Sequence, residues 1–383
     1  MRSLMNSLSE PTLVMVPGPT NLHPRVLQAM SQPMVSHTSK EFYNEFLEIL
    51  DLTRFVFQAK GEVVVFSGSG TLGMESTVAS LFERGDKVMS VETGFFGRRF
   101  TNISKIYGAQ TTVYSPPDGQ PADPAVLDEM LAKERYKAVI ITHIETSMGL
   151  INDVKPLVET AKKHGALAIV DSVCGLGGAE LRFDDWGIDV AFSASQKALA
   201  APPGATLLAL SPKALEVLGN RRSPIPSYYF DLRGWLKVMK DPKIYLSTPT
   251  VPVLRALRIA LQMVKEEGLE ARWTRHSRLA SAFRRGLTES GLELWPKKPS
   301  PLVTAVKVKD AGPIQQAMLR NHNVLVSRGL DTHKDDMIRV GHMGNVTKEQ
   351  LLVTLTAFGE SVKAELPSFD QGEALRAFFT AQG

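Results

Sequence analysis

Short apolar segments alternate with helical patterns of apolar residues through the first two thirds of the chain. Several of the apolar segments are continuous, as expected of strands that are buried on both faces. Strands are predicted at Glu62–Phe66, Lys87–Val91, Lys137–Thr142, Ala166–Asp171, Ile188–Ser193 and Ala205–Leu210. Helices are predicted at Glu41–Gln58, Thr71–Phe82, Arg98–Tyr107, Pro124–Ala132 and Val154–His164. This alternation predicts an α/β fold with a mainly parallel central sheet covered by helices on both faces.

The pattern changes after about Leu210. The segment Ser223–Thr250 is rich in proline and aromatic residues, which predicts an extended loop region with short elements. The following elements are predicted as helices near Val253–Lys265 and Leu269–Glu289, strands at Val303–Lys309, Val324–Ser327 and Met337–Val340, and helices at Pro313–Asn321 and Thr347–Glu365. We therefore expect an N-terminal arm (residues 1–21), a large domain (22–267) and a smaller C-terminal α+β domain (268–383).

Composition and charge narrow the class of protein. The 383 residues are 43% hydrophobic and 22% charged, as in an ordinary globular protein. A net charge of +4 is small for this length, so we expect no nucleic-acid partner, and no apolar segment is long enough to span a membrane. The single cysteine, Cys174, excludes an intrachain disulfide, and polar residues interrupt the first ten positions, where a signal peptide would need an apolar core. The expected location is the cytoplasm.

A glycine-rich turn joins the first predicted strand of the sheet to a helix. Residues 68–73 have the spacing of a dinucleotide-binding fingerprint, and Glu92 follows about 20 residues later, where an acid would bind a ribose. A nucleotide-dependent dehydrogenase is therefore one interpretation, and a tight turn without a ligand is another. The same glycines also let a phosphate approach the N–H groups of a helix N-terminus. The hydroxyls of Ser67, Ser69 and Thr71 suit a terminal phosphate group with several oxygens.

An acid and a lysine follow two other predicted strands. Asp171 ends the strand at 166–171, and Lys197 follows the strand at 188–193. Ligands bind at the carboxyl ends of strands in open α/β sheets, so both side chains are expected near the glycine-rich turn. Pyridoxal phosphate needs such a set: the lysine forms a Schiff base with its aldehyde, and the acid pairs with its protonated pyridine nitrogen. Taken singly, Asp171 could be a capping acid and Lys197 a surface lysine. Together with the glycine-rich turn, the two residues predict a site for this cofactor.

Motifs along nearly the whole chain resemble those of the class V aminotransferases of fold type I, in particular the alanine–glyoxylate and serine–pyruvate aminotransferases. The matching segments are Val16–Thr20, Ser67–Gly70, Gly94–Gly97, Glu145–Ser147, Asp171–Val173, Ser195–Ala198, Ala201–Gly204 and Ile338–Gly341. The resemblance implies a fold type I structure, pyridoxal 5'-phosphate as the cofactor, and a homodimer whose active sites are shared between the subunits.

The resemblance also implies roles for individual residues. Lys197 would hold the cofactor and carry a proton between it and the substrate Cα, and Asp171 would bind the pyridine nitrogen. Phe96 would stack on the cofactor ring, and Thr146 would contact the ring or the substrate. Arg339 would bind the substrate carboxylate, because its planar fork matches a carboxylate in two parallel hydrogen bonds.

A phosphate site built from two subunits is a further implication of the resemblance. One subunit would contribute Ser69, Gly70, Thr71 and Gln196, and the other would contribute Tyr245 and Thr248. Two positions depart from the best-known members of the group, which have tryptophan in place of Phe96 and histidine in place of Thr71. The smaller ring loses stacking area, and the hydroxyl changes the chemistry of the phosphate contact.

These residues predict a pyridoxal-phosphate-dependent aminotransferase that moves an amino group from alanine or serine to glyoxylate or pyruvate. The nearest alternative is a class V relative that uses pyridoxamine or 2-aminoethylphosphonate as the donor. A dehydrogenase would leave Lys197 without a role, and a non-catalytic scaffold would show no turnover. We expect no bound metal, because no two histidines have ligand spacing with an acid on one helix. Cys174 is interpreted as a small buried residue rather than as a nucleophile.

Overall fold

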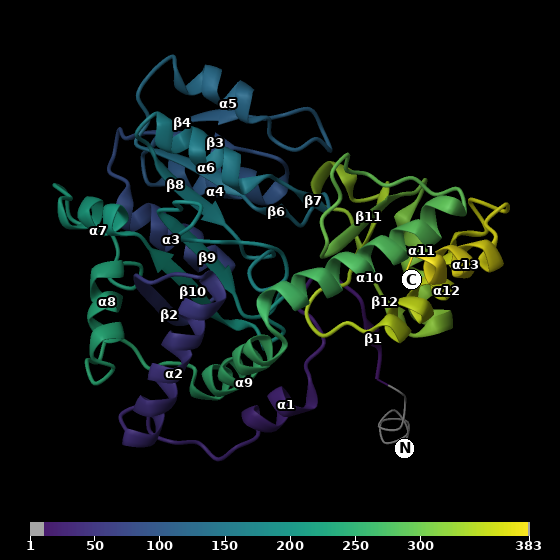
Figure 1. Cartoon of the computed structure of the whole chain (residues 1–383), viewed down its shortest axis with the longest axis horizontal. Helices are drawn as coiled ribbons and strands as arrows, with labels where there is room; N and C mark the ends of the chain where they lie inside the picture. The colour runs from purple at the N-terminus through teal and green to yellow at the C-terminus, as the bar shows by residue number, and fades with distance from the viewer. Residues whose placement is uncertain (1–10, 382–383) are drawn as a thin grey trace.

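A computed structural model describes residues 11–381 of the chain (Figure 1). A large α/β unit and a smaller α+β unit lie side by side, and the long helix α10 (Leu269–Glu289) runs from one to the other. Residues 1–10, which make up the first part of the predicted N-terminal arm and carry the argument about a signal peptide, lie outside the described residues. None of the described helices is long and apolar enough to cross a membrane.

A seven-stranded sheet forms the centre of the large unit, in the order β2-β10-β9-β8-β5-β3-β4. Its strands are β2 (Glu62–Gly68), β3 (Lys87–Val91), β4 (Gln110–Tyr114), β5 (Ala138–Thr142), β8 (Leu167–Asp171), β9 (Val190–Ala194) and β10 (Gly204–Leu210). β10 runs antiparallel to β2 and β9, and the other neighbours in the sheet are parallel. The predicted α/β fold with a mainly parallel sheet is therefore confirmed.

Helices cover both faces of this sheet. Every residue of β5 and β8 is therefore buried. The helices of the large unit are α1 (Pro24–Met30), α2 (Lys40–Phe57), α3 (Gly70–Leu81), α4 (Phe95–Ile106), α5 (Pro124–Leu131), α6 (Val154–Lys163), α7 (Pro212–Gly219), α8 (Leu232–Lys240) and α9 (Val251–Glu267). α3 packs against β9 and β10, α4 against β3 and β5, and α6 against β5 and β8. The packing therefore brings the N-termini of α3 and α4 to the sheet edge where β8 ends.

Several elements differ from the sequence-based expectation. α8 lies within the segment at 223–250 that was predicted as mainly extended; its buried Leu232, Trp235 and Met239 form one helical stripe, and Asp231 caps its first turn. α4 begins at Phe95 rather than at Arg98. The edge strand β4 was not predicted, because its residues are mostly half-buried and polar. The short helices α1 and α7 were also not predicted.

Among the described residues, the smaller unit combines an antiparallel sheet with α10 and three later α-helices. Its strands β11 (Val303–Lys307), β14 (Met337–Gly341) and β13 (Ser327–Arg328) lie in that order, and α11 (Ala311–His322), α12 (Lys348–Val362) and α13 (Gln371–Thr380) accompany them. Phe283, Ile314 and Phe358 belong to a hydrophobic core separate from that of the large unit. The predicted C-terminal α+β unit is confirmed in kind, whereas its division from the large domain at residues 267 and 268 stays a prediction.

The N-terminal segment connects the two units. β1 (Leu13–Val14) pairs in parallel with β12 (Val324–Leu325) of the smaller unit. The backbone oxygen of Met15 then accepts a hydrogen bond from the N–H of Gly341 (2.7 Å), and the N–H of Thr20 donates to the backbone oxygen of Gln196 (3.2 Å). The segment therefore crosses from the smaller unit to the residues next to Lys197.

Candidate active site

Most of the predicted cofactor residues line one cavity, of about 420 Å³, at the carboxyl ends of the central strands. The predicted residues in its lining are Ser69, Gly70, Thr71, Phe96, Thr146, Asp171, Gln196 and Lys197. The lining residues that sequence reasoning missed are Met74, Arg99, Ile144, Val173 and Cys174. A cavity of this size is typical of a small-molecule site.

Lys197 lies beneath the N-terminal segment. Its Nζ donates a hydrogen bond to the backbone oxygen of Pro17, and Oγ1 of Thr20 donates to the backbone oxygen of Lys197 (3.2 Å). Gly18 has a φ of +96°, and a Cβ there would lie 2.6 Å from Cδ of Lys197, so a side chain at this position would clash. Burial lowers the pKa of Lys197, which favours the neutral amine that can attack an aldehyde.

Asp171 ends β8 and is only 4% exposed. Its Oδ1 accepts a hydrogen bond from the N–H of Val173 (2.9 Å), and its backbone oxygen accepts one from the N–H of His143 (2.8 Å). Burial raises the pKa of Asp171 to about 7. Within residues 11–381, no ion pair gives its carboxylate a compensating cation. A protonated ring nitrogen would supply that cation, which fits the predicted role of Asp171.

Four of the residues predicted to bind the phosphate, Ser69, Gly70, Thr71 and Gln196, line the cavity at the N-terminus of α3. Ser69 is the N-cap of this helix but makes no capping hydrogen bond, so backbone N–H groups of the first turn are available to an anion. A Cβ on Gly70 would lie 2.6 Å from Cγ2 of Val173, so packing requires glycine there. Gln196 lines the same cavity, and the nitrogen of its side-chain amide is a donor that an anion can accept from. An uncapped helix N-terminus beside hydroxyl and amide groups fits a phosphate.

Phe96 is positioned by a buried carboxylate that sequence reasoning did not single out. Oε2 of Glu145 accepts hydrogen bonds from the N–H groups of Phe96 and Gly97 (3.1 Å each). Oε1 of the same residue accepts from the N–H and Oγ of Ser147 (3.1 and 2.6 Å). An acid at a helix N-terminus compensates the helix dipole. Glu145 therefore anchors the first turn of α4 from another segment, and no cap next to α4 in the sequence signals where the helix begins.

Cys174 follows Asp171 closely and is 2% exposed, which confirms that it is buried. Burial raises the pKa of its thiol. Its place in the cavity lining beside Lys197 was not predicted. A thiol held in its neutral form is a poor nucleophile, in agreement with its interpretation as a small packing residue.

Arg339 approaches the cavity without lining it. It lies on β14 and is 6% exposed; its Nη1 donates to the backbone oxygen of Thr146 (3.1 Å), and its Nε donates to that of Arg328 (2.9 Å). Burial lowers the pKa of Arg339 to about 10, so the guanidinium remains charged near neutral pH. Among the described residues Nη2 has no hydrogen-bond acceptor, which leaves that nitrogen for a carboxylate.

Tyr245 and Thr248 do not reach this cavity within one chain. They lie between α8 and α9, where their hydroxyl oxygens are 3.1 Å apart. Tyr245 is 65% exposed and lines a separate small pocket with Phe42 and Trp235. Their predicted contact with a phosphate in a second subunit stays a prediction.

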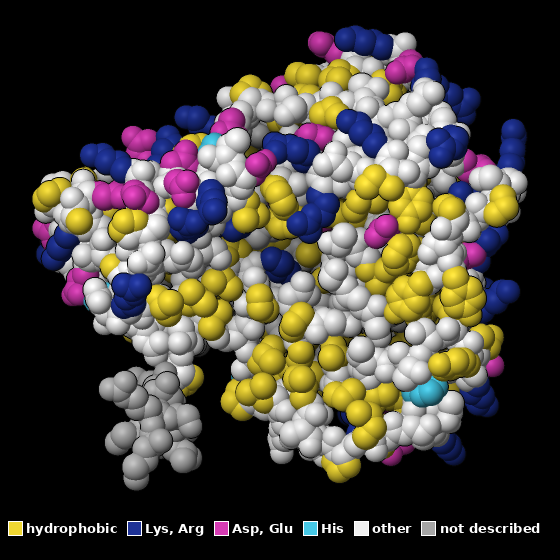
Figure 2. All heavy atoms as spheres, turned by 180° about the vertical axis from the view of Figure 1, so that it is seen from behind, with side chains coloured by type: hydrophobic (Ala, Val, Ile, Leu, Met, Phe, Trp, Pro, Cys, Tyr) yellow, Lys and Arg dark blue, Asp and Glu magenta, His cyan; other side chains and the backbone are white. Residues whose placement is uncertain are grey.

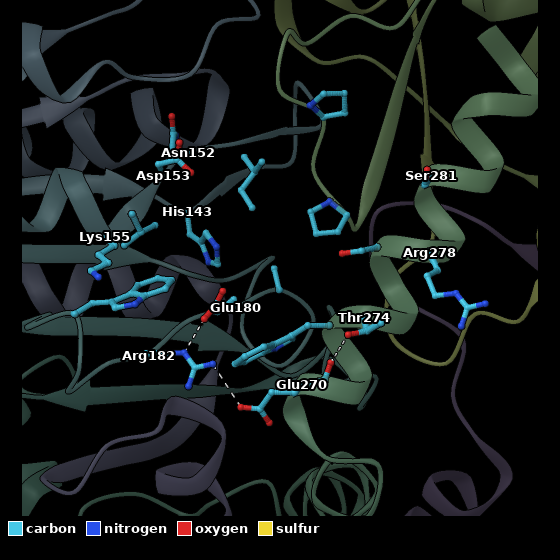
Figure 3. Close-up of a pocket in the computed structure, with 18 of the residues that line it drawn as sticks. His143, Asn152, Asp153, Lys155, Glu180, Arg182, Glu270, Thr274, Arg278 and Ser281 are labelled. Carbon is cyan, nitrogen blue, oxygen red and sulfur yellow. Dashed lines mark hydrogen bonds and ion pairs between the residues drawn. The ribbon is translucent and has the colours of Figure 1, made fainter. Parts of the chain in front are cut away.

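A larger cavity, of about 860 Å³, lies between the two units and contains none of the predicted site residues (Figure 3). His143 lines it on one side, and Thr274 and Ser281 of α10 line the other. Arg182, at the cavity wall, pairs with Glu180 (2.6 Å) and Glu270 (3.5 Å). Of these two cavities, the smaller one brings together a lysine, a buried acid and an uncapped helix N-terminus, which makes it the candidate active site.

This fold, with a lysine and a buried acid facing an uncapped helix N-terminus, defines a fold type I enzyme that uses pyridoxal phosphate. Residues 14–352 match the family model described as aminotransferase class-V, and the chain belongs to that family. It is a pyridoxal-phosphate-dependent aminotransferase. This gives Lys197 a role and leaves the dehydrogenase interpretation of residues 68–73 without support.

Three comparisons describe its relatives. The chain is 34% identical over 356 residues to alanine–glyoxylate aminotransferase 1 of Saccharomyces cerevisiae. This alignment covers 86% of this chain and 91% of the relative. Its structure matches ureidoglycine–glyoxylate aminotransferase from Bacillus subtilis with a TM-score of 0.93 and 30% identity, over 97% of this chain and 98% of the other. It matches pyridoxamine–pyruvate aminotransferase from Mesorhizobium loti with a TM-score of 0.93 and 27% identity, over 97% of each chain.

Proposed function

We propose that the protein transfers an amino group from alanine or serine to glyoxylate or pyruvate. The observation that carries this proposal is Arg339, a buried cation beside Thr146 with one nitrogen left for a substrate carboxylate. The cavity of about 420 Å³ must also hold the cofactor, which favours a substrate of few atoms. Two of the relatives compared above are named for glyoxylate as the amino acceptor, with different donors.

The cavity residues divide the chemistry among themselves. When bound, pyridoxal phosphate supplies an aldehyde and a ring that draws electrons from the substrate Cα. Nζ of Lys197 would hold the cofactor through its aldehyde, and the free amine would accept the Cα proton of the substrate and give it up again as the general base and acid. Asp171 would keep the ring nitrogen protonated, and Phe96 and Thr146, which line the same cavity, would orient the ring. Arg339 holds the substrate carboxylate while the proton moves.

The phosphate is proposed to be bound by Ser69, Gly70, Thr71 and Gln196 at the N-terminus of α3. Helix N–H groups and hydroxyls can together donate to several phosphate oxygens. This anchoring would fix the distance between the aldehyde and Lys197 during both halves of the reaction, because the phosphate stays in place while the amine changes partner.

Replacing Arg339 by alanine is expected to weaken amino-acid use while sparing cofactor binding. Loss of a charge-assisted hydrogen bond costs about 1.5–3 kcal/mol, which corresponds to roughly a ten- to hundredfold lower kcat/KM. The measurement is steady-state kinetics with alanine and serine, together with a pyridoxal phosphate titration. Arg339→Lys is the matched control, because it keeps the charge but not the planar fork and should lose less.

The donor can be distinguished with the same Arg339 variant. If pyridoxamine were the true donor, the half-reaction with pyridoxamine would be spared, because that molecule has no carboxylate, and only the oxo-acid half would suffer. If the variant loses cofactor as strongly as it loses substrate, Arg339 does not bind the substrate carboxylate.

We also propose a homodimer with shared active sites. Tyr245 and Thr248 lie outside the cavity of their own chain, in a segment where Tyr228 and Ile244 are also exposed. Figure 2 shows many hydrophobic side chains on the surface of the large unit, on the side opposite to the view of Figure 1. Exposed apolar surface of this kind is typical of a protein interface. In a dimer with two-fold symmetry, Tyr245 and Thr248 of each chain would complete the phosphate site of the other.

Mixing two defective variants is expected to restore activity. Lys197→Ala lacks the lysine, and the double variant Tyr245→Ala with Thr248→Ala is impaired in phosphate binding when cofactor is limiting. After unfolding and refolding in equal amounts, about half of the dimers would be hybrids, and each hybrid would hold one intact site. Roughly one quarter of wild-type activity should return. Activity no higher than the sum of the two parents would confine the site to a single chain.

The proposed location is the cytoplasm. Cys174, the single cysteine, is free and buried, so the chain carries no disulfide of the kind common in oxidising compartments. The proposed partners are a small amino acid, a small 2-oxo acid and a second copy of this chain. The net charge of +4 gives no reason to add a nucleic acid.

A further inference from the structure

Arg99 is a cation in the cofactor cavity that has no role in the mechanism given above. It lies on α4, one turn after Phe96, and lines the cavity. Its guanidinium carbon is 5.0 Å from the centre of the Phe96 ring and 5.1 Å from that of Phe95. Its Nη1 donates a hydrogen bond to Oγ1 of Thr71 (3.1 Å). No carboxylate within residues 11–381 forms an ion pair with it.

The contact with Thr71 determines where the hydroxyl proton of that residue can point. Arginine has only donors, whereas a hydroxyl has one proton and two acceptor sites. Arg99 therefore occupies an acceptor site of Oγ1, and the hydroxyl proton remains for another acceptor. Thr71 lies in the first turn of α3, whose N-cap Ser69 leaves the helix N-terminus uncapped. An acceptor bound there would receive both the hydroxyl proton and the backbone N–H groups.

The charge of Arg99 suits the same acceptor. A phosphate monoester carries nearly two negative charges near neutral pH, and a helix N-terminus supplies only a partial positive charge. The guanidinium of Arg99, which has no ion-pair partner among the described residues, adds a full positive charge in the same cavity. The ring of Phe96 attracts the guanidinium through a cation–π contact and restricts its position.

We propose that Arg99 is a positioning residue for the cofactor phosphate: it orients the Thr71 hydroxyl toward a phosphate oxygen and adds positive charge at the N-terminus of α3. The proposal rests on the proposed location of the phosphate. It assigns the neighbouring Arg98 no such role, because the Arg98 side chain is 53% exposed and pairs with Asp331 instead.

The test compares two ligands that differ only in the phosphate. Cofactor-free protein is titrated with pyridoxal phosphate and with pyridoxal, and binding is followed by the visible absorbance that either aldehyde gains on joining a lysine. Arg99→Gln should weaken binding of pyridoxal phosphate about tenfold or more, because a charge-assisted contact is lost, and should leave binding of pyridoxal unchanged. Arg98→Gln is the matched control and should change neither. Salt should weaken pyridoxal phosphate binding more in the wild type than in Arg99→Gln.

A second set of variants tests whether Arg99 acts through Thr71. Thr71→Val removes the hydroxyl with little change of shape and should also weaken binding of pyridoxal phosphate selectively. In the Arg99→Gln background its effect should be clearly smaller than in the wild type, because the Thr71 hydroxyl is then no longer oriented by Arg99. Arg99→Lys keeps the charge without the fork and should retain part of the affinity. If Arg99→Gln does not fold, as judged by thermal unfolding of the cofactor-free protein, Arg99→Lys and Thr71→Val carry the same comparison.

Three results separate the possible failures. If Arg99→Gln binds both ligands more weakly by the same factor, or binds both as well as the wild type does, the role of Arg99 at the phosphate is overturned. Additive effects of the Arg99 and Thr71 substitutions would overturn the orientation of the hydroxyl. Wild-type protein that binds pyridoxal and pyridoxal phosphate equally well would instead contradict the proposed phosphate site at α3, on which this inference depends.

Discussion

Replacing Lys197 by alanine is expected to lower transaminase turnover by at least about 10²–10⁴-fold, the usual contribution of a positioned general acid or base. The loss should be larger still, because the same amine is proposed to hold the cofactor. Pyridoxal phosphate should still bind without covalent attachment, since Thr71, Gln196 and the N-terminus of α3 are unchanged. The measurement is single-turnover kinetics with alanine and glyoxylate, alongside a binding titration.

The attachment point can be identified directly. Borohydride reduction of the cofactor-loaded wild type should fix the cofactor to the protein, and peptide mapping should find it on Lys197. Lys155→Ala is the control, because Lys155 is exposed and lines the larger cavity rather than the proposed active site. Label on another lysine, or a comparable loss of turnover in the control, would show that the active site is elsewhere.

Replacing Asp171 by asparagine should produce the second largest loss. Removing one partner of a buried ion pair costs about 3–5 kcal/mol, so a drop in kcat/KM of roughly 200- to 5,000-fold is expected if the pair strengthens in the transition state. The amide keeps the shape of the side chain but cannot stabilise a protonated ring nitrogen. The measurement is kcat/KM for alanine, with Asp153→Asn, at an exposed ion pair with Lys298, as the control.

The same substitution should change how cofactor binding depends on pH. Burial raises the pKa of Asp171 to about 7, so the carboxyl group of the cofactor-free protein is neutral below that pH and charged above it. A cationic ring nitrogen prefers the charged form, so wild-type affinity for pyridoxal phosphate should rise as pH increases toward 7. In Asp171→Asn, the increase in affinity that comes from ionisation of this carboxyl group should be absent. An unchanged pH profile in the variant would separate Asp171 from the ring nitrogen.

The strands and the residues at their ends could be predicted because the signals are local. β2, β5, β8 and β10 are continuous apolar segments, since a sheet covered on both faces leaves no polar side to signal in the sequence. Parallel strands align their carboxyl ends, so Asp171 and Lys197 were expected at the edge that also carries the glycine-rich turn. The cavity in the structure contains all three.

Other features could not be predicted because their signals come from distant segments. α4 begins at Phe95 because Glu145 accepts hydrogen bonds from the second and third residues of the helix, so no local cap marks its start. α8 was not predicted because it lies in a segment rich in proline and aromatic residues. Its apolar stripe is buried by a distant element, since Trp235 packs against Phe66 of β2. A local pattern does not report which distant surface will cover it.

The amino-acid sequence by itself determined the α/β class, the strand ends that carry Asp171 and Lys197, and the glycine-rich turn before α3, because each depends on neighbouring residues. Only the tertiary structure decided that Pro17 accepts a hydrogen bond from Lys197, that Glu145 holds the helix of Phe96, and that Arg99 reaches Thr71. These contacts join residues far apart in the chain. Their formation depends on how complete elements pack, and no local periodicity or motif spacing encodes that packing.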